Sequence, residues 1–443
     1  MRLNLETLRL KVETPNPLTV AVAYSVLFLL FIKVPGYSLI PAIAVLAVGL
    51  LVVGFFTPTL RAAKGAAGLL FGAVLAAVVG LALRHLAPNA QLPITNTPTQ
   101  LWMILLWVFA FPALVLAGYW ALERVNTFRG IVVACAGAAT SSLINSAEIS
   151  WKGDLGIFVT LLLLALTAKN LHLTRLVLAG SAVANALSDS RTMALVAVIV
   201  LLCTYLTSKH LDWVRQHPKR SLSLIIGGFV LMSFVMVQAM LSGLLGQDIQ
   251  HRTRLQVAGG NDLITAGRTE WAATLELFRQ SPWGFGAGVT PDGGMQTDAI
   301  GAAQKVGADY TNNVYWTEAV FGDRTDLHST LANLWAHFGI GGVLLAVVIA
   351  VLFASAIPGA VGLIRYMGAW PLFAILTGSW DLLFSPMANS DRIIMGLLAA
   401  VVLIHLGRNS DSILKPQLED GPPSITPQHV ETDQPWPLGR LRP

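Results

Sequence analysis

The stretch His328-Ser-Thr-Leu-Ala-Asn-Leu-Trp-Ala-His337-Phe-Gly-Ile-Gly-Gly342 lies where a long polar segment gives way to a long apolar one. Residues 343–357 continue it without a charged side chain. An apolar run of roughly 18 or more residues is long enough to cross the hydrocarbon core of a membrane as a helix. We therefore expect His328 to lie at a membrane–water boundary.

Similar apolar runs recur along the 443 residues, of which 54% are hydrophobic and 12% charged, with a mean hydropathy of +0.64. Soluble domains carry about 25% charged residues. The sequence therefore predicts an all-α polytopic membrane protein. Cys135 and Cys203 lie within apolar runs, so we expect small buried side chains and neither a disulfide nor a metal site.

About twelve transmembrane helices are predicted, with one large loop between the ninth and the tenth. Arg2, Arg9 and Lys11 precede the first span, as in a signal peptide, but no small-residue cleavage pattern follows, so we expect an uncleaved helix. The predicted spans are residues 17–33, 38–57, 65–86, 101–122, 129–149, 155–169, 172–189, 191–208, 221–245, 329–357, 362–386 and 391–407.

Positively charged residues are distributed unequally between the two sides of this topology. With both termini inside, eighteen of the 29 Lys and Arg fall in cytoplasmic segments. Six of the other eleven lie in the long loop, where the positive-inside rule does not apply, which leaves five outside. The bias predicts cytoplasmic termini and a periplasmic loop.

The predicted organisation has five parts. The tail is rich in Pro, Asp, Gln and Ser and poor in large apolar residues, which predicts disorder. The parts are a cytoplasmic N-terminus (1–16), transmembrane helices 1–9 (17–245), a periplasmic loop (246–327), transmembrane helices 10–12 (328–407) and a disordered cytoplasmic tail (408–443).

The loop contains one clear helical pattern, Gly267-Arg-Thr-Glu-Trp-Ala-Ala-Thr-Leu-Glu-Leu-Phe-Arg-Gln-Ser-Pro282, followed by the turn Gly284-Phe-Gly-Ala-Gly288. Trp271, Thr274, Leu275 and Phe278 share one face of this helix. The pattern fits an amphipathic helix on the outer membrane–water boundary. It fits equally well a helix that packs as a cap on the bundle.

Three ionisable residues are predicted to lie on the outer face at one depth: Arg191, Arg268 and His328. Ionisable residues in this position are functional candidates. Two arginines suit a pyrophosphate, because guanidinium is permanently charged and binds phosphate oxygens in a bidentate fork. Arg191 could instead pair with Asp189 or anchor its span at the interface.

His328 is the side chain of this face that titrates near neutral pH, which suits a general base. The alternative is a structural role in beginning the helix. His337 would be rotated by about 180° from His328 and displaced by about 13 Å along a regular helix. We expect His337 to be a buried histidine that is hydrogen-bonded to a neighbouring helix.

Other patterns nearby predict packing and not chemistry. The Gly-rich turn after Pro282 has no strand before it, which excludes a dinucleotide loop. Asp292 and Asp298 are too loosely spaced to form a metal site, and no His or Cys set accompanies them, so we expect no metal and no cofactor. Positions of close helix packing are expected at Gly339, Gly341 and Gly342.

Three segments, in this order, resemble the O-antigen ligase and polymerase superfamily of bacterial membrane glycosyltransferases. They are Ser188-Asp-Ser-Arg191, then Gly267-Arg-Thr-Glu-Trp271 with Ser281-Pro-Trp-Gly-Phe-Gly286, and His328-Ser followed after nine residues by Gly339-Ile-Gly-Gly342. The resemblance implies a GT-C-type fold in the bacterial inner membrane, a periplasmic active site and an undecaprenyl-pyrophosphate-linked glycan donor. It implies that Arg191 and Arg268 bind the pyrophosphate, while His328 activates an acceptor hydroxyl for inverting attack.

The His-Ser and Gly-x-x-Gly pattern is most similar to lipopolysaccharide O-antigen ligases, whose acceptor is lipid A core. An O-antigen polymerase and a protein O-oligosaccharyltransferase remain alternatives. A transporter or flippase is disfavoured, because no internal repeat is evident and the ionisable residues gather at one face and not at the midplane. The expected partners are the lipid-linked donor, the lipid A core acceptor and membrane lipids, with no nucleic acid.

Overall fold

The structure is a computed structural model. It describes residues 16–29, 32–34, 37–41, 66–90, 92–94, 98–122, 124–125, 127–145, 151, 155–188, 190–244, 246–247, 250–251, 253–254, 269–308, 314–322 and 325–385.

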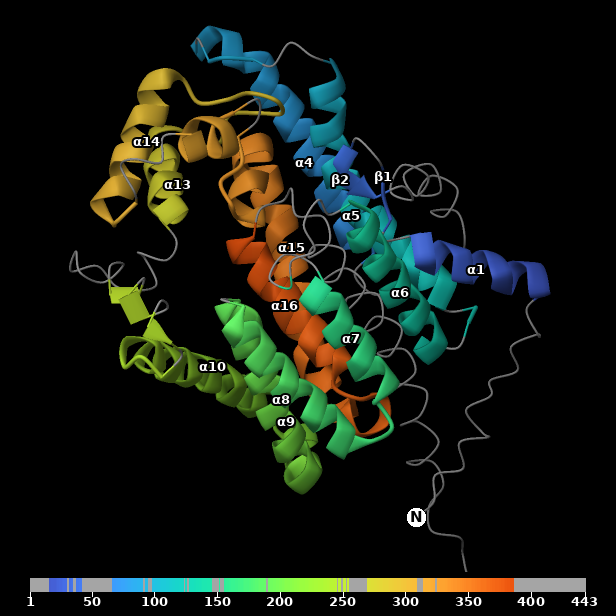
Figure 1. Ribbon diagram of the computed structural model, residues 1–443. Helices are drawn as coiled ribbons and strands as arrows, with labels where there is room; N and C mark the ends of the chain where they lie inside the picture. The colour runs from blue at the N-terminus through green and yellow to red at the C-terminus, as the bar shows by residue number, and fades with distance from the viewer. Residues whose placement is uncertain are drawn as a thin grey trace, which may run out of the picture. The chain divides into compact units, whose positions relative to one another are not determined.

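The described residues are mostly helical, with one short antiparallel pair of strands (Figure 1). The elements are α1 (Pro17–Leu29), β1 (Lys33–Val34), β2 (Tyr37–Pro41), α4 (Ala66–Leu86), the 3-10 helix η1 (Ala87–Ala90), α5 (Pro98–Leu122), α6 (Thr127–Asn145), α7 (Gly156–Leu166), α8 (Leu171–Leu187), α9 (Arg191–Gln216), α10 (Pro218–Leu241), α13 (Thr269–Gln280), α14 (Gly293–Lys305), the π-helix η3 (Tyr315–Val320), α15 (Thr330–Met367) and α16 (Trp370–Phe384).

Helices α4 to α10 follow the third to the ninth predicted spans, and α15 and α16 follow the tenth and the eleventh. Within the described part of the chain, Gly68–Leu86 and Thr330–Gly362 are long and apolar enough to cross a membrane, and the other apolar helices are shorter. The all-helical class is therefore confirmed in outline. The twelfth predicted span, 391–407, lies outside the described residues.

The first two predicted spans differ from the structure. Helix α1 ends at Leu29, four residues early, and the second predicted span begins as a strand, because Tyr37–Pro41 pairs with Lys33–Val34. The two residues between the strands are Pro35 and Gly36, a pair that favours a turn over a helix. Most of the second predicted span lies outside the described residues.

The boundary between the tenth and the eleventh predicted spans is also wrong. The predicted spans end at residue 357 and resume at residue 362, but α15 continues without a break through Pro358 to Met367. Gly368, at a φ of 80° that disfavours a side chain, ends the helix instead.

Helix α15 changes direction at Gly339, whose φ of 53° and ψ of −140° are not helical. In a regular helix the carbonyl of Ala336 would accept from residue 340; here it accepts from the amides of Phe285 (2.8 Å) and Gly286 (3.2 Å). The Trp335 indole donates to the carbonyl of Pro282 at 3.0 Å. The kink therefore fastens the Gly-rich turn of the long loop to α15.

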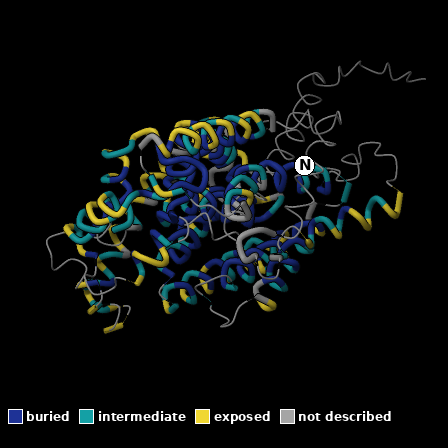
Figure 2. The backbone as a smooth tube through the Cα atoms, turned by 90° about the horizontal axis from the view of Figure 1, so that it is seen from above, coloured by how far each residue is buried: buried dark blue, intermediate teal, exposed yellow. Residues whose placement is uncertain are grey.

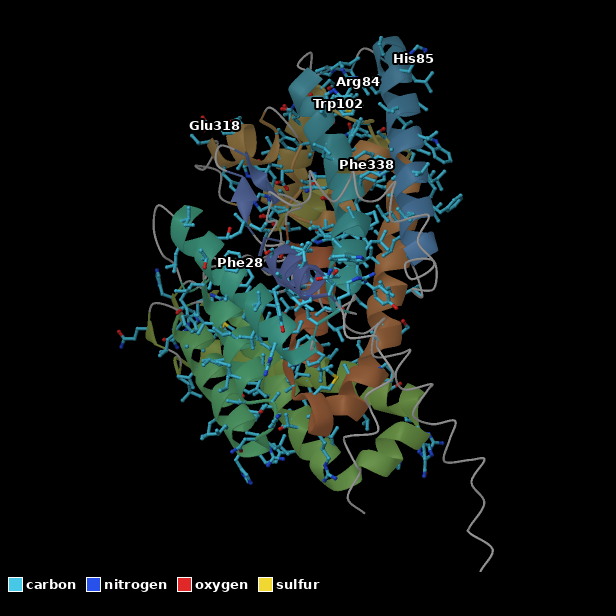
Figure 3. The ribbon with its side chains drawn as sticks, turned by 90° about the vertical axis from the view of Figure 1, so that its right-hand side faces the viewer. Phe28, Arg84, His85, Trp102, Glu318 and Phe338 are labelled. Atoms are coloured by element: carbon cyan, nitrogen blue, oxygen red, sulfur yellow. The ribbon has the colours of Figure 1, made fainter. Side chains whose placement is uncertain are left out.

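The same turn is held to α4 from its other side. The amide of Ala287 donates to the carbonyl of Gly80, and Nη1 of Arg84 donates to the carbonyl of Ala287 at 3.0 Å. Figure 3 labels Arg84 near the C-terminal end of α4 and Phe338 on α15. These contacts bring the C-terminal end of α4 and the kink of α15 to the same turn.

The loop builds an apolar core of its own against the start of α15. Its members include Leu277 of α13, Ala303 of α14, Trp316 of η3 and Trp335 of α15, all nearly inaccessible to solvent. Figure 2 shows buried and exposed stretches alternating along the chain. The loop is thus a packed unit that can hold functional groups in fixed positions.

Candidate active site

His328 lies in the loop immediately before α15 and is half-buried. Ser329 caps the helix, because its hydroxyl accepts from the amide of Ala332 at 3.2 Å. The helix cap is therefore Ser329, and His328 is the residue immediately before it. Its backbone has a φ of 52°, and no other non-glycine residue in the described part of the chain has a positive φ.

The imidazole of His328 has one nitrogen committed to the backbone. Nδ1 lies 3.2 Å from the carbonyl oxygen of Asp326. A carbonyl only accepts, so Nδ1 carries the proton of the neutral ring and the lone pair is on Nε2. This tautomer leaves Nε2 able to accept a proton.

The loop around His328 is fixed by buried hydrogen bonds. The Asn333 side chain donates to Asp326 Oδ1 at 2.9 Å and accepts from the amide of Leu327 at 2.7 Å. The same Asp326 oxygen accepts from the amide of His328 at 3.2 Å. Asp326 and Asn333 are 6% and 0% exposed, so this network is shielded from competing water.

Tyr315 contacts His328 from another part of the loop and is itself held by Glu270. The Tyr315 ring lies with its centroid 5.4 Å from that of His328, at 53° between the planes. The Tyr315 hydroxyl donates to Glu270 Oε1 at 2.5 Å. Glu270 is in the first turn of α13, so the start of that helix is linked through Tyr315 to His328.

The start of α13 also contacts the end of α16. Nε1 of Trp271 donates to the carbonyl of Leu383 at 3.2 Å, and the Trp271 ring lies 6.3 Å from that of Phe384. The carbonyl of Ser385 accepts from the Thr330 hydroxyl at 3.2 Å. The ends of α13, α15 and α16 therefore surround the loop that carries His328.

Arg191 is the first residue of α9 and is half-buried. Two residues later, Met193 receives a hydrogen bond from Thr377 of α16, eight residues before Ser385. The helix that carries Arg191 thus packs on the helix whose end contacts Thr330. Its suggested partner Asp189 lies outside the described residues.

Arg268 lies outside the described residues. The next residue, Thr269, is described and begins α13. The predicted loop helix, 267–282, is confirmed as α13, which begins two residues later and ends two residues earlier than predicted. It packs through Ala273 and Leu277 and leaves Leu275 and Phe278 of the predicted apolar face 62% and 47% exposed. The predicted face is therefore only partly used for packing.

His337 is fully buried, as predicted. Its Nε2 lies 2.9 Å from the carbonyl of Thr325, a residue of the long loop. Two of the three predicted packing glycines lie against α4. A Cβ at Gly341 would lie 2.8 Å from Cα of Ala76, and a Cβ at Gly339 would lie 2.8 Å from Cδ1 of Leu83 as well as against the carbonyl of Trp283, whereas Gly342 faces its own helix.

One ion pair of the loop joins Glu276 and Arg279 on α13. The Arg279 guanidinium, helped by the Gln280 amide, lowers the pKa of Glu276 from 4.5 to about 2. Among the described residues, no three His, Cys, Asp or Glu side chains are grouped as metal ligands would be. The arrangement places the His328 imidazole among carboxyl groups that are already engaged in hydrogen bonds, those of Glu270 and Asp326.

One family of known proteins matches part of this chain. A model of the O-antigen ligase family matches residues 176–347, which includes Arg191, the long loop and the kink of α15. This part of the chain is therefore similar to the O-antigen ligase family. No curated protein and no solved structure matches the chain.

The match to the O-antigen ligase family model, together with the apolar helices, supports a membrane protein with a function of the general O-antigen ligase or polymerase type. The family implies glycosyltransferase-like chemistry on a lipid-linked glycan, with lipid A core as acceptor in general terms.

Four residues of the site were not singled out from the sequence: Glu270, Tyr315, Asp326 and Asn333. Asp326 and Asn333 stand two residues before and five residues after His328, and a buried polar residue that close to a candidate base is a usable signal. Tyr315 has no such signal, because its place beside His328 depends on the path of the loop.

Proposed function

We propose that this protein is an O-antigen ligase that transfers a glycan from undecaprenyl pyrophosphate to a sugar hydroxyl of lipid A core, with His328 as the general base. The observation that carries the proposal is the committed Nδ1 of His328, which leaves the lone pair on Nε2. The acceptor hydroxyl loses its proton to Nε2 as its oxygen attacks the anomeric carbon. The bond from that carbon to the pyrophosphate breaks, and a single displacement of this kind inverts the anomeric centre.

The leaving undecaprenyl pyrophosphate needs positive charge, and we assign this role to Arg191 and Arg268. Fixed cations at the position where negative charge develops lower the barrier without reorganisation. The position of Arg191 at the start of α9 is compatible with this role. The assignment of Arg268 rests on the resemblance and on Glu270, two residues further on, which contacts Tyr315. Because two guanidinium groups take the place of a metal ion, we propose that the reaction is metal-independent.

The proposal includes a topology. About twelve transmembrane helices cross the inner membrane in a GT-C-type arrangement, with both termini in the cytoplasm and the site in the periplasm. The lipid-linked donor would reach the site from within the membrane. The exposed Leu275 and Phe278 of α13 support contact between the loop and the outer membrane–water boundary. Related activities, O-antigen polymerisation or transfer to protein, use the same base and leaving group and differ in the acceptor.

The test is reconstitution of the purified protein with a polyprenyl-pyrophosphate-linked glycan and one of three acceptors: lipid A core, a second donor molecule or a pilin-like protein. Lipid A core should be the preferred acceptor, and chelation by EDTA should leave the rate unchanged. Rescue of an EDTA-inactivated enzyme by a divalent ion would refute the metal-independent mechanism. Preference for another acceptor would reassign the protein within the family, and glycan movement across the bilayer without transfer would favour a flippase.

His328→Ala should lower kcat by about 10²-fold or more, the usual range for loss of a general base. The matched control is His337→Gln, because the glutamine amide can still donate to the carbonyl of Thr325 and should preserve kcat. Loss of activity in His337→Gln, with normal activity in His328→Ala, would refute the assignment.

Arg191→Ala and Arg268→Ala should weaken use of the donor more than use of the acceptor, whereas Arg279→Ala should leave both unchanged.

A further inference from the structure

The ring of Tyr315 lies beside that of His328, with 5.4 Å between the two centroids. Tyr315 and Glu270 are both half-buried, and they come from different elements, the start of η3 and the first turn of α13. Their 2.5 Å hydrogen bond joins a phenol to a carboxyl oxygen, and such bonds are about twice as strong as bonds between neutral groups when the acceptor is ionised. Glu270 therefore restrains the Tyr315 ring.

Tyr315 is also anchored from the backbone side. It opens the π-helix Tyr315–Val320, and the next residue, Trp316, is 2% exposed and stacks on Phe321 at 6.3 Å. A π-helix is rare and is found often at functional sites. The phenol ring is thus supported at both ends, by a buried neighbour and by a carboxylate.

The imidazole needs such support, because the one hydrogen bond that it makes within the described residues, to the carbonyl of Asp326, fixes the tautomer but not the tilt of the ring. We propose that Tyr315, held by Glu270, is a positioning residue that sets the plane of the His328 ring and so the direction of Nε2. The proposal rests on the role of His328 as the general base. Alignment of a base with the proton that it abstracts affects the rate directly, and displacements near 1 Å can be costly.

The first experiment compares Tyr315→Phe, Glu270→Gln and the double variant in the reconstituted transfer reaction. Each single change should lower kcat by about tenfold, the equivalent of one hydrogen bond, and leave the KM of donor and acceptor unchanged. Both changes break the same hydrogen bond, so the double variant should be no slower than the slower single variant. Glu318→Gln is the matched control, an exposed carboxyl of the same π-helix (Figure 3).

The second experiment asks whether Tyr315 acts through His328. In the His328→Ala background, Tyr315→Phe should lower the residual rate no further. Carbethoxylation of His328 by diethyl pyrocarbonate, followed by mass spectrometry of its peptide, should be at least doubled in Tyr315→Phe and in Glu270→Gln. The Glu318→Gln variant should match the wild type, and the thermal midpoint of each variant reports whether it is folded.

The outcomes separate the two proposals. If His328→Ala is fully active, the proposed function fails whatever the tyrosine does. If His328→Ala is inactive while Tyr315→Phe and Glu270→Gln keep wild-type kcat and carbethoxylation rates, the positioning role is refuted and the base is retained. A raised KM for the donor at unchanged kcat, or losses in the two single variants that multiply in the double variant, would also overturn it.

Discussion

At the residue scale, His328 joins a reactive side chain to a backbone conformation that L residues rarely adopt. Its φ of 52° costs about 1–3 kcal/mol, which the surrounding structure must offset. The buried bonds from Asn333 to Asp326 and Leu327 hold the loop in this shape. The strained backbone conformation thus occurs at the residue whose imidazole must point in one direction. This is what a pre-organised site requires.

A second residue-scale feature, the ion pair of Glu276 and Arg279, gives a pH prediction. The folded pKa of Glu276, about 2, lies below its ordinary value of 4.5, so the pair stabilises α13 above about pH 4.5. That contribution is lost progressively as the pH falls toward 2. Glu276→Gln should speed hydrogen exchange in peptides covering 269–280 at pH 7, and the difference from the wild type should shrink below pH 4.5.

Glu318→Gln serves as the control, since its exposed carboxyl should leave exchange in these peptides unchanged at every pH. A difference between wild type and Glu276→Gln that stayed constant from pH 7 to pH 2 would contradict the lowered pKa.

At the element scale, the helices were predictable and the kink of α15 was not. Apolar runs determine where α4 to α10 begin and end to within a few residues, except that α9 continues to Gln216 through a polar last turn. Gly339 in an apolar run indicates close packing from sequence alone, because small residues usually serve that purpose between membrane helices. Its actual role depends on the carbonyl of Trp283, 56 residues earlier, which local sequence cannot reveal.

The kink makes a clear prediction for glycine substitutions. Gly339→Ala places a Cβ on a backbone with positive φ and against the carbonyl of Trp283, so it should detach the loop turn from α15. We expect a loss of stability of about 1–3 kcal/mol, seen as a lower thermal midpoint and a lower transfer rate. Gly359→Ala on the same helix has no atom within 4 Å of the new Cβ and should be neutral or slightly stabilising. Equal midpoints for the two variants would exclude a structural role for the kink.

At the scale of the whole molecule, α15 is too long for its entire apolar stretch to lie in a membrane. Thr330–Gly362 contains 33 residues, about 50 Å as a helix, against about 30 Å of hydrocarbon. Thr330 to Gly339 is mostly buried beneath the loop, whereas Ile340, Leu344, Val347 and Val351 are exposed at helical spacing. We infer that the hydrocarbon begins near the kink, so that His328 lies above it in the aqueous layer. The sequence placed His328 at the boundary but could not give this depth, because burial beneath the loop depends on tertiary packing.

Single cysteines test this arrangement and its orientation together. A small charged maleimide added to intact cells should label Thr297→Cys, on the exposed side of α14, and should label Gln216→Cys, at the end of α9, only after the inner membrane is opened. Leu344→Cys should stay unlabelled in both conditions, because a thiol in hydrocarbon does not ionise to the reactive thiolate. Wild-type protein provides the background, since Cys135 and Cys203 are buried. Labelling of Gln216→Cys in intact cells would show that the topology is the reverse of the one proposed. His328 would then lie on the side opposite to a periplasmic acceptor.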